Sequence, residues 1–165
     1  MTAAFLLDTS FLITLVDDRR PWHAVARQYF EHALSSGAVM HVSTLALAEF
    51  GIKQAVTDLP LRNLRVLPFN IDHALAAGRL APIVTQARDS GDDRTAVRTD
   101  LNLIAQADSE QIPYILTEDR RTLAKYVDRA SSAGATHCRA VVLSSGFDPS
   151  WFNDGQSSLE FSQPE

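Results

Sequence analysis

Short apolar runs alternate along this chain with longer segments in which apolar residues recur every three or four positions. The runs have the length and the β-branched or aromatic content of buried strands, and they cover residues 4–8, 38–43, 64–69, 113–117 and 139–144. The segments between them have helical periodicity and cover residues 10–18, 21–37, 43–56, 71–91, 98–111 and 119–134. This alternation predicts an α/β fold, a three-layer α/β/α sandwich whose central parallel sheet has about five strands.

The chain contains neither an internal repeat nor a linker, so we expect one domain over residues 1–146. The remaining residues, 147–165, are rich in Ser, Gln, Pro and Asp, a composition that forms little packed structure. We therefore expect a polar C-terminal tail that adds little to the core. Three aromatic side chains could still order parts of this tail: Trp151, Phe152 and Phe161.

Composition narrows the class of protein. No stretch of about 18 apolar residues is present, so we expect no membrane span and no membrane partner. The first residues carry no secretion signal, and the single cysteine, Cys138, excludes an internal disulfide, so we expect a cytoplasmic protein. The net charge of -5 argues against a protein that coats nucleic acid by bulk positive charge. It leaves open a nuclease, whose catalytic carboxylates are themselves negative.

Two acidic residues follow predicted strands. Asp8 ends the first strand, and Asp119 follows the fourth. In an open parallel sheet, ligands bind at the C-terminal ends of the strands, near the point where the strand order reverses. A single Asp at such a turn is also a common helix N-cap, and that alternative stays open for each residue.

Two further acids lie on apolar helix faces, where a carboxylate is costly. At helical spacing Glu49 has the neighbours Leu45, Ala46, Ile52 and Val56, and Asp100 has Leu103, Ile104 and Ala107. Asp100 stands near the first turn of its predicted helix, so a salt bridge or a contact with the helix dipole would also explain it. Four converging carboxylates would repel one another, and Mg²⁺ or Mn²⁺ would relieve that repulsion through hard oxygen ligands.

Four segments, "LLDTSFLITLV", "VSTLALAEF", "TDLNLIAQA" and "YILTEDRRTL", resemble the four acidic motifs of the PIN domain family in order and separation. The resemblance covers about residues 4–145. It implies a parallel α/β/α sandwich and a metal-dependent ribonuclease that cuts single-stranded RNA. Small stand-alone members resemble VapC toxins of toxin–antitoxin pairs, so the resemblance also implies an antitoxin protein as partner and a homodimer.

Carried over by motif, the catalytic acids fall on Asp8, Glu49, Asp100 and Asp119. The resemblance implies that the three aspartates bind one or two Mg²⁺ or Mn²⁺ ions and that Glu49 ligates or orients the attacking water. Glu118 adjoins Asp119 and could share its role.

Contacts with RNA need basic or polar residues, because the acids attract no phosphate. We expect Thr9 and Ser10, which follow the first acid, to contribute, together with Arg94, Arg98 and Arg120 beside the third and fourth motifs. A solvated helix face would equally explain these arginines.

Three other functions are alternatives to this one. A haloacid-dehalogenase-like phosphatase expects a second Asp two residues after the first, where this chain has Ser10. A response-regulator receiver expects an acid pair near the first strand and a late lysine, and neither is evident. The alternative from another class is a PIN fold that acts in RNA processing or as a scaffold or binding module, without strong nuclease activity.

Overall fold

A single parallel sheet forms the centre of the protein. The computed structural model describes residues 3–86 and 88–153. The strands are β1 (Ala4–Leu7), β2 (Val39–Ser43), β3 (Arg65–Leu67), β4 (Tyr114–Thr117) and β5 (Arg139–Val142). They pair in the order β3-β2-β1-β4-β5, and every pair is parallel. The prediction of a parallel sheet with about five strands is therefore confirmed.

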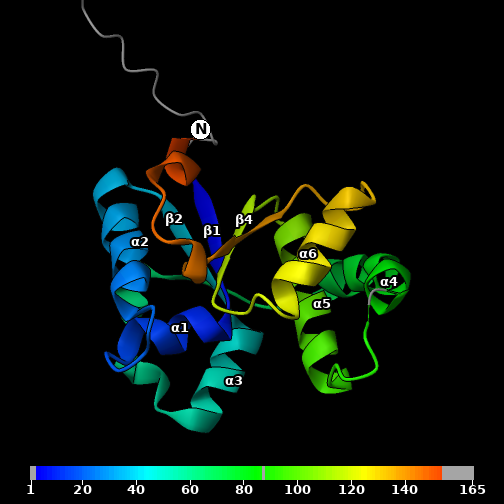
Figure 1. The fold of residues 1–165 in the computed structure, drawn as a ribbon, viewed down its shortest axis with the longest axis horizontal. Coiled ribbons are helices and arrows are strands. Elements are labelled where there is room, and N and C mark those ends of the chain that lie inside the picture. Colours follow the sequence, from blue (N-terminus) through cyan, green and yellow to red (C-terminus); the bar gives the residue numbers. More distant parts are fainter. Residues whose placement is uncertain (1–2, 87, 154–165) are drawn as a thin grey trace, which may run out of the picture.

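Helices cover both faces of this sheet (Figure 1). One layer holds α1 (Thr9–Val16), α2 (His23–Ser36) and α3 (Thr44–Lys53). The other holds α4 (Ile71–Gln86), α5 (Arg94–Ser109) and α6 (Leu123–Ser132). Short 3-10 turns span Val56–Asp58, Leu61–Asn63, Leu143–Ser145 and Pro149–Asn153. Among the described residues, no helix combines the length and the apolar character needed to cross a membrane.

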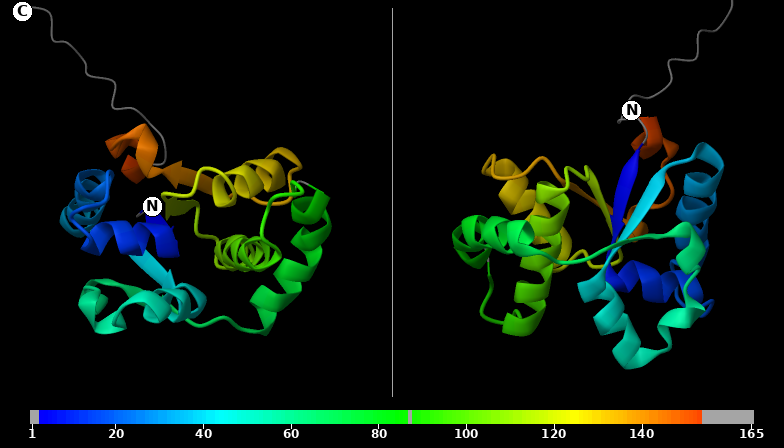
Figure 2. Two further views of the ribbon diagram at one scale, coloured as in Figure 1. Left: turned by 60° about the horizontal axis from the view of Figure 1, so that its bottom comes forward. Right: turned by 180° about the vertical axis from the view of Figure 1, so that it is seen from behind.

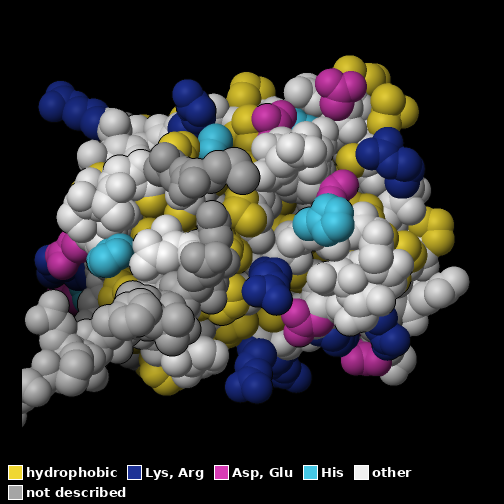
Figure 3. Space-filling model, turned by 90° about the horizontal axis from the view of Figure 1, so that it is seen from above, with side chains coloured by type: hydrophobic (Ala, Val, Ile, Leu, Met, Phe, Trp, Pro, Cys, Tyr) yellow, Lys and Arg dark blue, Asp and Glu magenta, His cyan; other side chains and the backbone are white. Residues whose placement is uncertain are grey.

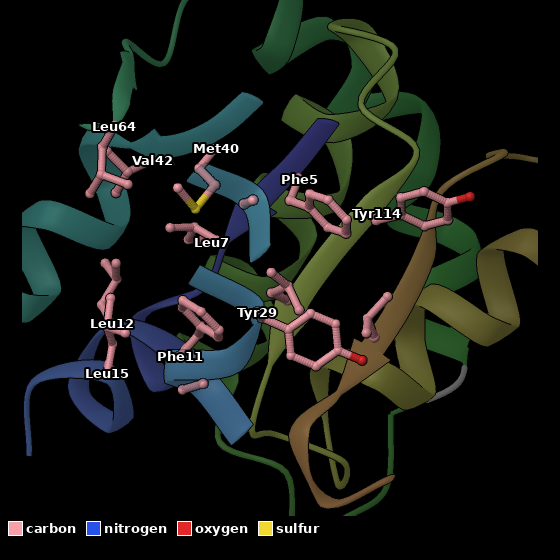
Figure 4. Close-up of a cluster of buried hydrophobic side chains, with 14 of the residues drawn as sticks. Phe5, Leu7, Phe11, Leu12, Leu15, Tyr29, Met40, Val42, Leu64 and Tyr114 are labelled. Carbon is pink, nitrogen blue, oxygen red and sulfur yellow. The ribbon is translucent and has the colours of Figure 1, made fainter. Parts of the chain in front are cut away.

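The central strand β1 is buried on both faces, which explains its unbroken apolar sequence. Phe5 and Leu7 point into the core beneath α1, α2 and α3, where they meet Phe11 and Tyr29 (Figure 4). Leu6 points the other way, into the core beneath α4, α5 and α6. The side chains of Phe5, Leu6 and Leu7 are all fully buried. The strand therefore anchors both cores and holds the residue that follows it at a fixed place.

The start of the 147–165 segment packs into the first of these cores. Phe152 is buried, and its ring lies 4.8 Å from that of Phe5, centroid to centroid. The ring of Trp151 meets Tyr114 edge-on at 5.2 Å. We expected this segment to add little to the core, but its described part contributes aromatic side chains, which bury large apolar areas. Phe161 lies outside the described residues.

One helix boundary differs from the prediction in a way that affects the site. We expected a helix over residues 98–111, whereas α5 begins at Arg94, one turn earlier. Asp93 caps it, because its carboxylate accepts a hydrogen bond of 2.8 Å from the backbone N–H of Thr95. Asp100 consequently lies beyond the first turn, which removes the helix-dipole explanation of its position.

The strand order reverses between β1 and β4. The chain builds β2 and β3 on one side of β1 and then crosses to β4 on the other side. The C-terminal ends of β1 and β4 therefore form the switch point at which open α/β sheets bind ligands. Seen from this end, α5 lies between α1, α3 and α6 (Figure 2, left). At the opposite end of the molecule, positive and negative side chains are interspersed (Figure 3).

Candidate active site

Asp8 follows β1 directly and begins α1. Its Oδ1 accepts a hydrogen bond of 2.7 Å from the N–H of Thr9, and its Oδ2 accepts the hydroxyls of Ser10 at 2.6 Å and Thr117 at 2.8 Å. Burial raises the pKa of Asp8, and these hydrogen bonds oppose the rise. The N-cap alternative is thus correct as a description of local structure, yet it does not exclude a role in a site.

The same hydroxyls join β1 to the loop after β4. Ser10 Oγ accepts a hydrogen bond of 2.9 Å from the N–H of Glu118, and Thr117 Oγ1 accepts one of 2.9 Å from the N–H of Asp119. The carboxylate of Asp119 accepts hydrogen bonds of 2.9 Å from the backbone N–H groups of Arg121 and Thr122. It also accepts a hydrogen bond from the hydroxyl of Thr122. Both aspartates at strand ends are therefore held in place by short polar contacts.

Glu49 reaches the same place from α3. Its Oε2 accepts a hydrogen bond of 2.7 Å from the hydroxyl of Thr9. The prediction that Glu49 lies on a buried apolar stripe was wrong, because Glu49 itself is exposed and Ile52 is 85% exposed. The buried residues of α3 are Ala46 and Phe50. The helix extends beyond the end of the sheet, so only a narrow face of it is covered (Figure 1).

Asp100 joins the other acids from α5, and its carboxyl group is strongly perturbed. It is 7% exposed on α5, and the apolar neighbours Leu103, Ile104 and Ala107 are fully buried, as predicted. Its Oδ2 is buried without a hydrogen-bond partner among the described residues. Burial, followed by the negative charges of Asp8, Asp119 and Glu49, raises the pKa of Asp100 to about 8, against a hydrogen bond from Thr122. The carboxyl group of Asp100 is therefore mostly protonated at neutral pH in the metal-free protein.

One cavity of about 220 Å³ collects these groups. Its lining includes the four predicted acids, the two predicted polar residues and two cations: Asp8, Glu49, Asp100, Asp119, Thr9, Ser10, Arg20 and Lys53. Sequence reasoning missed both cations. Lys53 stands four residues after Glu49 on one helix, a spacing that could have indicated it. Arg20 belongs to the polar run "DDRR" after α1, which resembles any solvated loop.

The structure places the other predicted residues elsewhere. Arg94 and Arg98 are exposed on α5 and do not line this cavity. Arg120 lines a separate, open groove along α6, together with Lys125 and Arg129. Glu118 points its carboxylate at Arg20 and at the hydroxyl of Thr14 instead of at the other acids.

The donor set of the cavity fits a hard divalent cation. Carboxylate and hydroxyl oxygens line it, no histidine or cysteine does, and one buried carboxylate oxygen of Asp100 has no described partner. As the side chains stand, no three acidic, histidine or cysteine side chains in the described ranges are arranged to hold an ion. The oxygens of Asp8, Glu49 and Asp119 instead accept hydroxyl and backbone hydrogen bonds. A bound cation would compete with those hydrogen bonds.

Comparison with known proteins identifies the family of the chain. Residues 5–129 match the family model of the PIN domain. No curated protein sequence matches the chain.

Three solved structures share the fold, and each was compared over 98% of its own chain. VapBC2 from Rickettsia felis, bound to a promoter DNA fragment, has a TM-score of 0.58 and 14% identity over 84% of this chain. DNA-bound VapBC from Salmonella typhimurium has a TM-score of 0.56 and 18% identity over 86% of this chain. VapC20 from Mycobacterium tuberculosis, described as a toxin that cleaves the sarcin–ricin loop, has 0.52 and 18% over 82%. At these identities the similarity is one of fold.

Proposed function

The chain belongs to the PIN domain family, and from that premise we propose that it is a metal-dependent endoribonuclease that hydrolyses phosphodiester bonds of single-stranded RNA. One observation carries the proposal. Asp100 keeps a buried carboxylate oxygen without a described partner, beside three other acids and at the switch point of the sheet. A buried carboxyl group at this place is costly, and a bound divalent cation would offset that cost.

Each acid has a role in this proposal. Asp8, Asp100 and Asp119 hold Mg²⁺ or Mn²⁺, and Glu49 orients the attacking water. A bound divalent ion would lower the pKa of that water and neutralise charge that develops on the phosphate. Thr9 stands beside these acids and fixes the Glu49 carboxylate through its hydroxyl, which donates to Oε2 at 2.7 Å.

The neighbouring hydroxyl and the cations complete the site. Ser10 locks the loop that carries Asp119, because its Oγ accepts the N–H of Glu118 at 2.9 Å. Arg20 and Lys53 supply positive charge inside a cavity that otherwise repels phosphate.

The similar structures support a proposal about the biological role. Two of them are VapBC complexes and the third is a toxin, so we propose that this chain is the toxin of a type II toxin–antitoxin pair with an antitoxin protein as partner. The homodimer and the cytoplasmic location expected from the sequence stay predictions.

A second function has one observation in its favour. The oxygens of Asp8, Glu49 and Asp119 are already engaged by hydrogen bonds, as they would be in a PIN fold that only binds RNA or serves as a scaffold. Such a protein would bind RNA without cutting it.

Incubation of the purified protein with a single-stranded RNA separates the two functions. We expect cleavage with Mg²⁺ or Mn²⁺, none in excess EDTA, and none by the Asp100→Asn variant under any condition. The variant controls for contaminating nucleases, because it would be purified in the same way. Cleavage that continues in EDTA would contradict the metal mechanism, and binding without cleavage would favour the scaffold.

A further inference from the structure

The guanidinium of Arg20 makes few of the hydrogen bonds that it could donate. It lies in the loop between α1 and α2 and lines the acidic cavity. Its Nη2 donates a hydrogen bond of 2.8 Å to Oε2 of Glu118, and the hydroxyl of Thr14 donates to that same oxygen. Its Nε is buried and has no hydrogen-bond partner within the described part of the chain. A guanidinium has five N–H donors, so most of its capacity is left for a ligand.

A purely structural ion pair explains this arrangement poorly. Carboxylates commonly take two parallel hydrogen bonds from arginine, whereas Glu118 is bonded to one nitrogen only. A buried N–H without a hydrogen-bond partner costs about 1–3 kcal/mol. An ion pair that only held the loop in place would not require that cost. The contact does fix the guanidinium, because the Glu118 side chain is only 17% exposed and holds it from one side.

We propose that Arg20 is a catalytic residue that binds a non-bridging oxygen of the phosphate being cleaved, and that Glu118 is its positioning residue. This inference rests on the proposed function. Planar guanidinium groups bind phosphate oxygens through two parallel N–H bonds, which suits a ligand that approaches beside the carboxylates. Glu118 does not line the cavity and already holds Arg20, so we do not count it among the metal-binding acids.

The chemical role is charge stabilisation. During hydrolysis the oxygen of water bonds to phosphorus and water gives up one proton, while the bond from phosphorus to the leaving sugar oxygen breaks and that oxygen takes up one proton. Negative charge grows on the non-bridging oxygens as this happens. Arg20 keeps its proton throughout and donates hydrogen bonds to that charge. Removal of one such donor typically lowers kcat by about 100- to 1000-fold.

Arg20→Met tests the catalytic role, with Arg19→Met as the matched control. Arg19 is next in sequence, but its side chain is 86% exposed and pairs with Asp17 outside the cavity. With Mg²⁺, we expect kcat for a single-stranded RNA to fall about 100-fold in Arg20→Met and to stay unchanged in Arg19→Met. In EDTA, where no cleavage intervenes, fluorescence anisotropy should show weaker binding of the same RNA. Its salt slope should fall by about 0.7, the value for one lost phosphate contact.

Arg20→Lys keeps the charge opposite Glu118 but removes the planar fork. It should fold like the wild type and still lose most of kcat, so the inference remains testable if Arg20→Met unfolds. Both variants should keep the thermal shift that Mg²⁺ produces, because neither removes a proposed ligand of the ion. Arg20 variants that cleave at the wild-type rate, while the wild type is active, would overturn the inference and leave the proposed function standing. A wild type that does not cleave would overturn both.

Glu118→Gln tests the positioning role. We expect kcat to fall about 10-fold with little change in KM, and we expect Mg²⁺ to stabilise the variant as it does the wild type. In the Arg20→Met background the same change should have no further effect, because the residue that it positions is gone. An equal loss in both backgrounds would contradict positioning, and a lost Mg²⁺ shift would make Glu118 a metal ligand instead.

Discussion

The carboxyl group of Asp100 makes the free energy of unfolding depend on pH in a direction that can be worked out from the structure. Burial and three neighbouring acids raise its pKa from 3.8 to about 8 in the folded, metal-free protein. The folded state therefore holds a proton that the unfolded state has released above about pH 4. Asp100→Asn keeps the size of the side chain but carries no titrating proton.

The sign follows from proton linkage. For an acid whose folded pKa is raised, the unfolding free energy is greatest below the unfolded pKa and falls as pH rises toward the folded pKa. Each pH unit in that window is worth about 1.4 kcal/mol for one proton. Between pH 5 and pH 7 the wild type should therefore lose about 3 kcal/mol more than the variant does. Asp8 contributes similarly to both, because Asp100 is uncharged in both over this range.

Urea unfolding in EDTA, followed by the fluorescence of the tryptophans at pH 5, 6, 7 and 8, measures this difference. We expect the unfolding free energy to fall with pH more steeply for the wild type than for Asp100→Asn, whose remaining slope comes from Asp8, with the variant the more stable protein at pH 8. Parallel curves for the two proteins would refute the reasoning, since Asp100 would then titrate normally. Added Mg²⁺ at pH 8 should stabilise the wild type, by about 2.7 kcal/mol at 100 times its dissociation constant, and the variant much less.

Three further predictions concern Asp8, the two exposed arginines of α5 and Phe152. Asp8→Asn should preserve the cap of α1 but abolish cleavage and most of the Mg²⁺-induced rise in Tm; equal rises would leave Asp8 as a cap alone. Arg94 and Arg98, both changed to Ala, should weaken RNA binding and flatten its salt dependence, and an unchanged salt slope would place the RNA path elsewhere. Phe152→Ala should lower the unfolding free energy by about 3 kcal/mol in urea titrations, whereas a loss below 1 kcal/mol would show that the segment is dispensable.

Strong periodicity made the sheet and its two helical layers predictable. Phe5, Leu6 and Leu7 form an unbroken apolar run because β1 is buried on both faces. Such a run can be recognised from the local sequence alone. The burial of Leu103, Ile104 and Ala107 around Asp100 was predictable for the same reason.

The face of α3 was not predictable, because apolar spacing does not reveal whether a helix extends past the sheet that would cover it. Ile52 fits an apolar stripe in sequence and is 85% exposed in the structure. The position of Arg20 at the cavity was unpredictable for a related reason. Its partner Glu118 is 98 positions away, so only the tertiary fold brings the two together.

Separation along the chain also has a consequence for biosynthesis. The hydrogen bond between Thr117 and Asp8 joins residues 109 positions apart, across two strands that are neighbours in the finished sheet. At about 5–20 residues per second, a ribosome needs roughly 5–20 s to add that stretch. During this time β1 lacks β4, and the first two motifs have been translated without the fourth. A nascent chain therefore cannot assemble the acidic cavity until the fourth motif has been translated, and any partner that binds the N-terminal half before then meets a protein in which that cavity has not yet formed.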